Sequence, residues 1–277
     1  MKPILKWAGG KGTLIPHILK LFPLNYKSLT YHEPFFGGGA LFFKIRPRSG
    51  SINDINTKLM NFYRSVRDNP DELISQAQQY EYDKGTYYML RDRFNQPHVP
   101  ELEQSAFFLY LNKTSFNGLY RVNSKGNFNV PFGRYKNPTI VPKKTILAAS
   151  KILKKVDIRN EDFSYIVGYA KKGDLCYFDP PYQPVSETAN FTSYSVKGFS
   201  LAEQRRLLDV CLDLSANGVY WVLSNSFADP IRELYQDIKN IQMTVIQAPR
   251  SISSKASTRG STNEILITNV PEQQRIV

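Results

Sequence analysis

The chain has 277 residues, which suffices for one large α/β domain or for one domain with a substantial insertion. It carries 36 lysines and arginines against 24 aspartates and glutamates, and this net charge of +12 favours polyanionic partners. Two cysteines are too few for a disulfide framework or a zinc site. No apolar stretch is long enough for a membrane span or a signal peptide, so we expect a cytoplasmic protein without a membrane partner.

Three regions differ in their patterns along the chain. Residues 1–55 and 144–277 alternate short strand-like and helix-like segments, whereas residues 56–143 are mostly helical and end in a glycine-punctuated hairpin. Strands that alternate with helices predict an α/β fold, with a mostly parallel sheet covered on both faces. The helical block between the two halves is then an inserted subdomain. The predicted strands are Thr30–Glu33, Ser51–Asp54, Val156–Arg159, Asp174–Phe178, Val219–Ser224, Met243–Ala248 and Glu264–Asn269.

The N-terminal segment KWAGGKGT places lysines on both sides of a glycine turn. A phosphate-binding P-loop requires a glycine where Leu5 stands, so the spacing does not favour a nucleotide hydrolase. The turn still offers backbone donors and positive charge. We expect it to close over a cofactor or to contact a DNA phosphate.

Three consecutive glycines, Gly37–Gly39, follow the first predicted strand. Glycine lets the backbone approach a ligand closely and adopt positive φ. The second predicted strand ends at Asp54, and an acid at this place binds the ribose hydroxyls of nucleotides. Because the spacing is not the dinucleotide fingerprint, it suits a nucleoside ligand without a pyrophosphate, and S-adenosylmethionine is the obvious candidate. The alternative is a tight strand–helix turn that Asp54 caps.

A hairpin is predicted at residues 122–130, where strand-like flanks enclose an Asn-Ser-Lys-Gly turn. Basic residues surround it, among them Arg121 and Arg134. A two-stranded ribbon fits the major groove of DNA, and arginine there binds guanine with two hydrogen bonds. The alternative is an ordinary hairpin with solvated basic ends.

The apolar run Leu175–Phe178 ends abruptly in Asp179, Pro180, Pro181 and Tyr182. The prolines stop the strand. A carboxylate and a proline carbonyl bind the two hydrogens of an exocyclic amine and aim its lone pair at an electrophile, while the tyrosine stacks on the base. Open α/β sheets bind their ligands at such strand ends. The motif therefore predicts methyl transfer to an amine by positioning, with no metal implied.

A helix is predicted over Leu201–Ala216, because apolar residues recur on one face and Ser200 with Glu203 forms a capping box. The two cysteines, Cys176 and Cys211, lie in an apolar strand and on the apolar face of this helix. We expect both to be reduced core residues.

Taken together, these motifs resemble those of the DNA adenine-N6 methyltransferases. The resemblance extends from about residue 4 to residue 269. The block LYLNKTSFNGLYRVNSKGNFNVPFGRYKNP (109–138), with TANFTSYS (188–195) and RSISS (250–254), is similar to the GATC-methylating, Dam-type subfamily. The resemblance implies a Rossmann-like S-adenosylmethionine methyltransferase fold, with a mostly parallel seven-stranded sheet that contains one antiparallel strand.

For the cofactor, the resemblance implies that the glycine loop and Asp54 hold S-adenosylmethionine. It places the segment NEDF, just after the third strand, beside the adenine of the cofactor. The N-terminal lysine turn is expected at its methionine part. The expected cofactor-binding residues are Trp7, Lys11, Phe36, Gly37, Gly39, Asp54, Asp162, Phe163 and Asp179.

For DNA, the resemblance assigns Phe116, followed by Asn117, to the gap that a displaced base leaves in the duplex. The subfamily more often has tyrosine there, so phenylalanine retains the stacking and loses a hydroxyl contact. Arg121 is implied to read guanine, and Leu119 and Pro131 to contact a thymine methyl. Arg134 is implied to bind a backbone phosphate, and Lys6 to reach the outer part of the DNA site. The expected DNA-binding residues are Lys6, Phe116, Asn117, Leu119, Arg121, Asn123, Pro131, Arg134 and Arg250.

We therefore expect an S-adenosylmethionine-dependent enzyme that rotates adenine out of double-stranded DNA and methylates its N6 within GATC. Residues 1–55 and 144–277 are the expected catalytic domain, and residues 56–143 the expected target-recognition subdomain. The alternatives are a DNA amine methyltransferase with another target, such as cytosine N4 or a different adenine site, and a non-catalytic DNA-binding regulator. A monomer suffices to methylate a palindrome one strand at a time, so we expect a monomer in solution.

Overall fold

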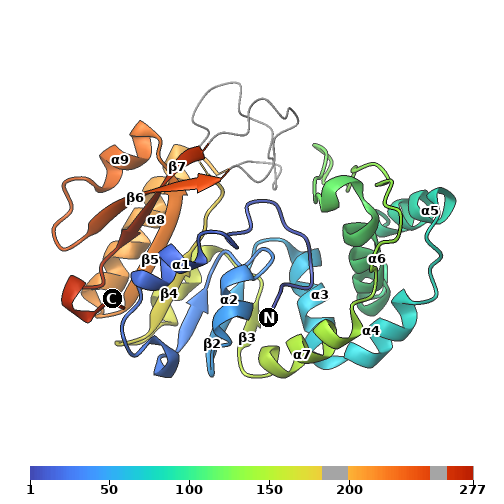
Figure 1. Ribbon diagram of the computed structural model, residues 1–277, viewed down its shortest axis with the longest axis horizontal. Coiled ribbons are helices and arrows are strands. Elements are labelled where there is room, and N and C mark those ends of the chain that lie inside the picture. The colour runs from blue at the N-terminus through green and yellow to red at the C-terminus, as the bar shows by residue number, and fades with distance from the viewer. Residues whose placement is uncertain (183–198, 250–260, 277) are drawn as a thin grey trace.

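The computed structural model describes residues 1–182, 199–249 and 261–276. A seven-stranded sheet occupies one side of the molecule and a group of helices the other (Figure 1). The strand order is β3-β2-β1-β4-β5-β7-β6, and β7 runs antiparallel to both of its neighbours. The other neighbouring strands pair in parallel. This architecture confirms the predicted α/β methyltransferase fold.

The strands lie close to their predicted positions, with shifted ends. The last two are longer than expected, because they pair with each other along their whole length. Their bounds are β1 Tyr31–Glu33, β2 Gly50–Asn53, β3 Asp157–Arg159, β4 Leu175–Phe178, β5 Tyr220–Ser226, β6 Gln242–Pro249 and β7 Ser261–Thr268.

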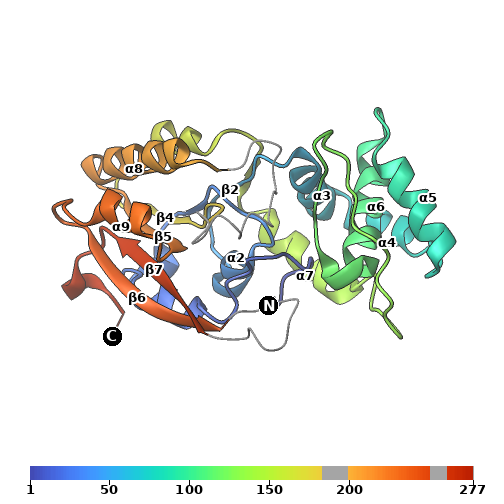
Figure 2. The ribbon, with the colours of Figure 1, turned by 90° about the horizontal axis from the view of Figure 1, so that it is seen from above.

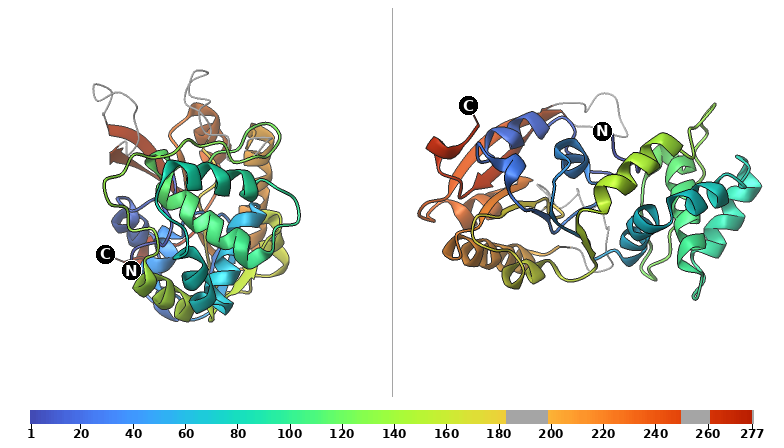
Figure 3. Two further views of the ribbon diagram at one scale, coloured as in Figure 1. Left: turned by 90° about the vertical axis from the view of Figure 1, so that its right-hand side faces the viewer. Right: turned by 90° about the horizontal axis from the view of Figure 1, so that it is seen from below.

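Helices cover both faces of the sheet, as the views from above and below show (Figures 2 and 3). Alternate residues of β4 enter different apolar clusters: Leu175 and Tyr177 pack with α1 and α2, and Cys176 and Phe178 pack with α8 and α9. This division follows from the period of two along a strand. The sheet helices are α1 Ile15–Lys20, α2 Ala40–Ile45, α8 Leu201–Ala216 and α9 Asp229–Tyr235.

The predicted helix over Leu201–Ala216 is confirmed at both ends, and the Ser200 side chain accepts from the Glu203 amide at 3.3 Å. Cys176 and Cys211 are both buried free thiols, as expected. None of the helices in the described part of the chain is long and apolar enough to cross a membrane.

The helical group stands at the β3 edge of the sheet, where α3 contacts β3. Its core of buried aromatic rings continues into the sheet cluster that contains α1 and α2. Helix α7 packs against α3 and α4, and the Ser150 hydroxyl donates to the Arg67 carbonyl at 3.0 Å. The helices here are α3 Thr57–Asp68, α4 Pro70–Ala77, α5 Lys84–Phe94, α6 Glu101–Thr114 and α7 Lys143–Leu153.

The predicted hairpin is present, but its flanks do not form continuous strands. Val122 and Phe128 make one isolated antiparallel bridge, and the Asn123 amide donates to the Asn127 carbonyl at 2.9 Å. The Asn95 side chain binds both the amide and the carbonyl of Phe128, at 2.8 and 2.9 Å. The expectation of strand-like flanks was wrong beyond this bridge. The bonds across the hairpin join Asn129 to Arg121 and Asn123 to Asn127, so Asn95, just after α5, binds backbone groups of Phe128 that face away from Val122.

Candidate functional site

The carboxyl ends of neighbouring parallel strands converge on one edge of the sheet. The side-chain Nδ2 of Asn53, at the end of β2, donates to the Pro34 carbonyl at 3.1 Å and to the Glu161 carbonyl at 3.0 Å. It thereby ties the segments that follow β1, β2 and β3 together. Ligands of open α/β sheets bind at such an edge, so this is the candidate site.

The glycine loop after β1 adopts a conformation that favours glycine. Gly37 and Gly39 have φ of 49° and 65°, and Gly39 precedes the first turn of α2. Asp54 holds the loop, because its Oδ2 accepts from the Gly37 amide at 3.0 Å and its Oδ1 from the Asn56 amide at 2.9 Å. Burial raises the pKa of Asp54, while these two hydrogen bonds oppose the rise.

Trp7 covers the glycine loop from outside. A Cβ atom on Gly37 would lie 2.8 Å from the indole ring, so only glycine fits there without movement. Trp7 also stacks on Tyr120 with ring centroids 5.3 Å apart. The Asn112 side chain binds both the amide and the carbonyl of Lys6, at 2.9 and 2.7 Å. The N-terminal segment therefore joins the glycine loop to the helical group.

Of the aromatic residues expected at the cofactor, Phe36 is buried in the core at 2% exposure, with its ring centroid 4.7 Å from that of Tyr63. Phe163 stacks on Phe35 at 5.2 Å between centroids. Asp162 caps the short helix η3, Phe163–Gly168, and pairs with Arg206. Phe36 thus shapes the loop from within, whereas the Asp162–Phe163 pair lies at the strand ends.

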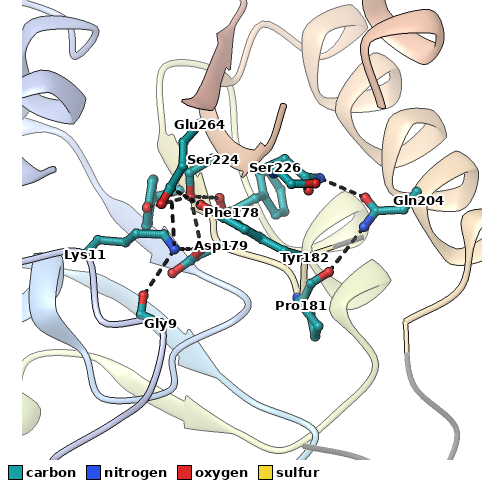
Figure 4. A network of polar contacts seen from close by, with 12 residues as sticks. Gly9, Lys11, Phe178, Asp179, Pro181, Tyr182, Gln204, Ser224, Ser226 and Glu264 are labelled. Atoms are coloured by element: carbon teal, nitrogen blue, oxygen red, sulfur yellow. Dashed lines mark hydrogen bonds and ion pairs between the residues drawn. The ribbon is translucent and has the colours of Figure 1, made fainter. Parts of the chain in front are cut away.

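Asp179 follows β4 and contacts Lys11 and Ser224 (Figure 4). Its Oδ1 lies 3.2 Å from the Lys11 Nζ and accepts from the Ser224 hydroxyl at 3.0 Å. No described residue donates a hydrogen bond to its Oδ2. Burial raises the pKa of Asp179, and the Lys11 ammonium opposes the rise. One carboxylate oxygen is therefore fixed and the other is open to a ligand.

The residues after Asp179 are anchored as well. The Gln204 side chain, on α8, donates to the Pro181 carbonyl at 3.2 Å and accepts from Asn225 at 3.0 Å. Pro180 is buried, and no described residue donates to its carbonyl. Residues 179–182 thus contain one carbonyl bound by α8, that of Pro181, and one that no described residue binds, that of Pro180. The Asp179 Oδ2 likewise has no hydrogen bond from a described residue.

Tyr182 meets two charged side chains (Figure 4). Its hydroxyl donates to the Glu264 Oε2 at 2.6 Å, and the Lys11 Nζ lies 4.1 Å from the centre of its ring. Burial raises the pKa of the Tyr182 hydroxyl well above its usual range, and the nearby Asp179 and Glu264 carboxylates add to the rise. The tyrosine is therefore neutral and donates its proton to Glu264.

The residues expected to bind DNA lie together on the hairpin and its base, close to Lys6. Phe116 is 52% exposed, and Asn117, which has a φ of 55°, is exposed as well. The Arg121 Nε donates to the Asn129 side chain at 2.8 Å, which fixes the direction of the guanidinium. Arg250 lies outside the described residues. Exposed or half-exposed are Lys6, Phe116, Asn117, Leu119, Arg121, Asn123, Pro131 and Arg134.

Four residues of the site were not found from the sequence: Ser224, Gln204, Glu264 and Asn112. Ser224, Gln204 and Glu264 stand outside the quoted motifs, and Asn112 lies in the quoted block 109–138 without having been assigned a role. Each of the four contacts a residue far along the chain. The available signal was polarity where burial was expected, because Ser224, Gln204 and Asn112 are polar residues that the fold buries.

A family model of the D12 class of N6 adenine-specific DNA methyltransferases matches residues 7–252, which include the glycine loop, the hairpin and the Asp179 motif. The chain belongs to this family. It is an adenine-specific DNA methyltransferase, and S-adenosylmethionine is its methyl donor. The match disfavours the two alternatives of cytosine-N4 methylation and of non-catalytic regulation.

Three relatives align with this chain over nearly their whole length. The Type II methyltransferase M1.LlaDCHI of Lactococcus lactis subsp. cremoris is 44% identical over 97% of this chain and 95% of its own. The Type II methyltransferase M.MjaIII of Methanocaldococcus jannaschii is 39% identical over 97% of this chain and 99% of its own. A DNA adenine methylase of Salmonella typhi is 35% identical, covering 96% and 94%.

The strand-end residues fit S-adenosylmethionine. Each Asp54 oxygen accepts one backbone N–H, and a carboxylate oxygen retains a second lone pair for a ribose hydroxyl. The neighbouring Ile55 side chain is 67% exposed, an apolar surface that suits a flat base. These carboxylate acceptors therefore match the hydroxyl groups of a nucleoside better than the negative charge of a pyrophosphate.

Proposed function

We propose that this enzyme methylates N6 of an adenine that is rotated out of duplex DNA, within the sequence GATC. The observation that carries the proposal is the end of β4. There an open Asp179 oxygen, the open Pro180 carbonyl and the Tyr182 ring lie within four residues. A base inside a duplex cannot reach a recessed strand end, so this geometry supports rotation of the adenine out of the stack.

The residues of the tetrapeptide divide the work on the amine. Asp179 Oδ2 and the Pro180 carbonyl each accept one N6 hydrogen, which directs the nitrogen lone pair away from the ring. The Tyr182 ring stacks on the adenine. When bound, S-adenosylmethionine supplies the methyl group as a sulfonium electrophile. Because Asp179 holds an N6 hydrogen throughout, it is also placed to keep the proton that the amine loses.

On the cofactor side, we assign Gly37, Gly39 and Asp54 to the nucleoside. The positive φ of the glycines supports close approach of the backbone, and Asp54 supplies acceptors for hydroxyls. Further assignments are Trp7, Lys11 and Asp179 to the amino-acid end, Asp162 and Phe163 to the adenine, and Phe36 to the shape of the loop.

On the DNA side, we assign Phe116 and Asn117 to the gap left by the rotated base. The exposure of the Phe116 ring supports this role, since a buried ring cannot enter a duplex. Arg121 is assigned to guanine, and its fixed direction supports a bidentate contact. We assign thymine contact to Leu119 and Pro131, and the DNA backbone or outer site to Lys6, Asn123, Arg134 and Arg250.

We propose the same division for the domains. Residues 56–143 read the target, and residues 1–55 with 144–277 bind S-adenosylmethionine and catalyse transfer. The continuous apolar core between the helical group and the sheet supports a fixed relation of the two parts. A monomer that acts on double-stranded DNA is the simplest state, because one chain carries both parts.

The test is incorporation of labelled methyl groups into two duplexes of equal composition, one with GATC and one with the four bases scrambled. We expect labelling of the GATC duplex only, with N6-methyladenine as the product found by mass spectrometry after digestion. Equal labelling of both duplexes would contradict the sequence assignment, and a product other than N6-methyladenine would contradict the chemistry.

A further inference from the structure

Glu264 is a carboxylate that no sequence motif marks, yet it lies among the reacting groups. It stands on β7, opposite Ser226 of β5 and Ile246 of β6. Its side chain is only 18% exposed. Charged side chains are seldom buried unless they are paired, so the position requires partners. The partners are the Tyr182 hydroxyl and the Lys11 ammonium.

The Lys11 ammonium lies on the face of the Tyr182 ring that is turned towards Asp179. Its Nζ is 4.1 Å from the ring centre and 3.2 Å from the Asp179 Oδ1. A base that bonds to Asp179 and stacks on that face needs the same volume. Lys11 must therefore leave the ring face when the base arrives.

Glu264 offers the nearest place for the displaced ammonium. Its Oε2 lies 3.9 Å from the Lys11 Nζ and holds the hydroxyl at the edge of the same ring. A short movement of the flexible lysine from the ring face to the ring edge brings it onto Glu264. The charge stays near Asp179, and no buried carboxylate is left without a cation.

We propose that Glu264 is a positioning residue for methyl transfer: it fixes the tilt of the Tyr182 ring and receives the Lys11 ammonium when the target adenine covers that ring. The proposal rests on the proposed function, because it assumes that adenine stacks on Tyr182. It adds no reaction step. Glu264 acts on the substrate only through Tyr182 and Lys11.

Three substitutions separate the two contributions of Glu264. In Glu264→Gln, the amide oxygen still accepts from Tyr182, but the charge that attracts Lys11 is lost. In Tyr182→Phe, the ring and the charge remain, but the hydrogen bond is lost. In Glu264→Ala both are lost. Loss of one bond to a charged group predicts a rate roughly tenfold lower for each of the first two, and roughly a hundredfold lower for Glu264→Ala. The matched control is Glu233→Gln, an exposed carboxylate of α9.

The rate to measure is single-turnover methyl transfer with saturating DNA and S-adenosylmethionine. A second readout is the fluorescence of 2-aminopurine in place of the target adenine, which rises when the base leaves the stack. We expect the DNA affinity and the control variant to match the wild type, and the transfer rate to fall. A wild-type transfer rate in Glu264→Gln, or in Tyr182→Phe if the first variant does not fold, would overturn the proposal.

A double-mutant cycle distinguishes positioning from a general loss of stability. In a Lys11→Met background there is no ammonium for Glu264 to receive, so adding Glu264→Gln should change the rate less than twofold. A full tenfold effect of Glu264→Gln in that background would overturn the role towards Lys11. Failure of the proposed function looks different, since the wild-type enzyme itself would then place no methyl group on GATC adenine.

Discussion

The strand-end site and the hairpin that we propose reads DNA are built in opposite ways. At the strand end, Asp179, Lys11 and Glu264 come from segments far apart in the chain, and their charges satisfy one another in a largely buried place. In the hairpin, Phe116 and Arg121 project into solvent from a loop that the helices hold from behind.

This contrast suits the two tasks that we propose for these regions. Groups that orient a reacting amine act best where water is excluded and partners are fixed in advance. Groups that read DNA must be reachable, and their contribution comes from direction and exposure. Substitutions at the strand end should therefore change the transfer rate while DNA affinity is retained. Substitutions in the hairpin should change affinity and site choice while the rate within the bound complex is retained.

The largest expected effect is that of Asp179→Ala. Loss of an aimed acceptor should lower the single-turnover rate by at least ~10²-fold, and the affinity for GATC duplex should match that of the wild type. Quenched single-turnover assays measure the transfer rate, and a DNA-binding titration measures the affinity for the duplex. The control is Asp213→Ala, an exposed carboxylate of α8. A variant that loses affinity in proportion to rate would erase the contrast between the regions.

Arg121→Ala tests the other side of the contrast. We expect the preference for GATC over a site with its guanine replaced to fall by about 1–3 kcal/mol, the value of a bidentate contact to guanine. The ratio of kcat/KM for the two duplexes measures it. Lys125→Ala, at the exposed turn, is the matched control and should weaken binding to both duplexes equally. If Lys125→Ala relaxes the preference as much, Arg121 is not the reader.

Gly37→Ala should loosen the cofactor side of the strand-end site. The residue has a φ of 49°, and the added Cβ would meet the Trp7 ring at 2.8 Å. We expect a loss of about 1–2 kcal/mol in unfolding free energy from the left-handed backbone, with weaker S-adenosylmethionine binding. Urea denaturation and calorimetric titration measure these. Gly168→Ala, where a Cβ meets open space, should change neither. If Gly37→Ala binds S-adenosylmethionine as tightly as the wild type, the glycine loop does not contact the cofactor.

The smallest expected effect concerns Glu33, at the end of β1. Burial raises its pKa well above the ordinary value of 4.5, although the Tyr31 hydroxyl donates to its Oε2 at 2.9 Å. The folded protein thus keeps the Glu33 proton to higher pH than the unfolded chain. Its contribution to stability is complete below about pH 4.5 and is lost as pH rises through the folded pKa.

Glu33→Gln has no carboxyl group to ionise, so it lacks this loss of stability at higher pH. The unfolding free energy of the wild type, relative to the variant, should therefore fall above pH 4.5 by at most ~1.4 kcal/mol per pH unit. Urea denaturation of both proteins at a series of pH values measures the difference. A difference that stays constant or grows with pH would show that Glu33 is ionised in the folded protein.

Local signals in the sequence predicted the elements that depend on local interactions. The helix after Ser200 was placed at both ends, because its cap and its apolar period lie within the segment itself. Asp179 and Tyr182 came from one tetrapeptide, and Asp54 from its place after the second strand. The hairpin flanks were predicted as strands from their local pattern, but within residues 121–131 they make only the isolated bridge between Val122 and Phe128.

The residues missed by the sequence reading depend on long-range topology. Glu264 reaches Tyr182 only because β7 enters antiparallel between β5 and β6 and aligns Glu264 with Ser226. Gln204 looked like one polar position on an amphipathic helix, and its contact with the Pro181 carbonyl depends on how α8 lies on the sheet. Neither relation is expressed in residue spacing.

The paired hydrogen bonds between Asn112 and Lys6 have a practical consequence for protein engineering. Chimeras that exchange residues 56–143 between relatives would sever these bonds unless the incoming segment also carries asparagine at this place. The N-terminal segment with Lys6 and Trp7 then loses its anchor on the helical group, and the glycine loop that Trp7 covers loses this contact. An exchange of residues 56–143 that changes the sequence preference should therefore also change the affinity for the cofactor. The N-terminal segment with Lys6 and Trp7 should be exchanged together with residues 56–143.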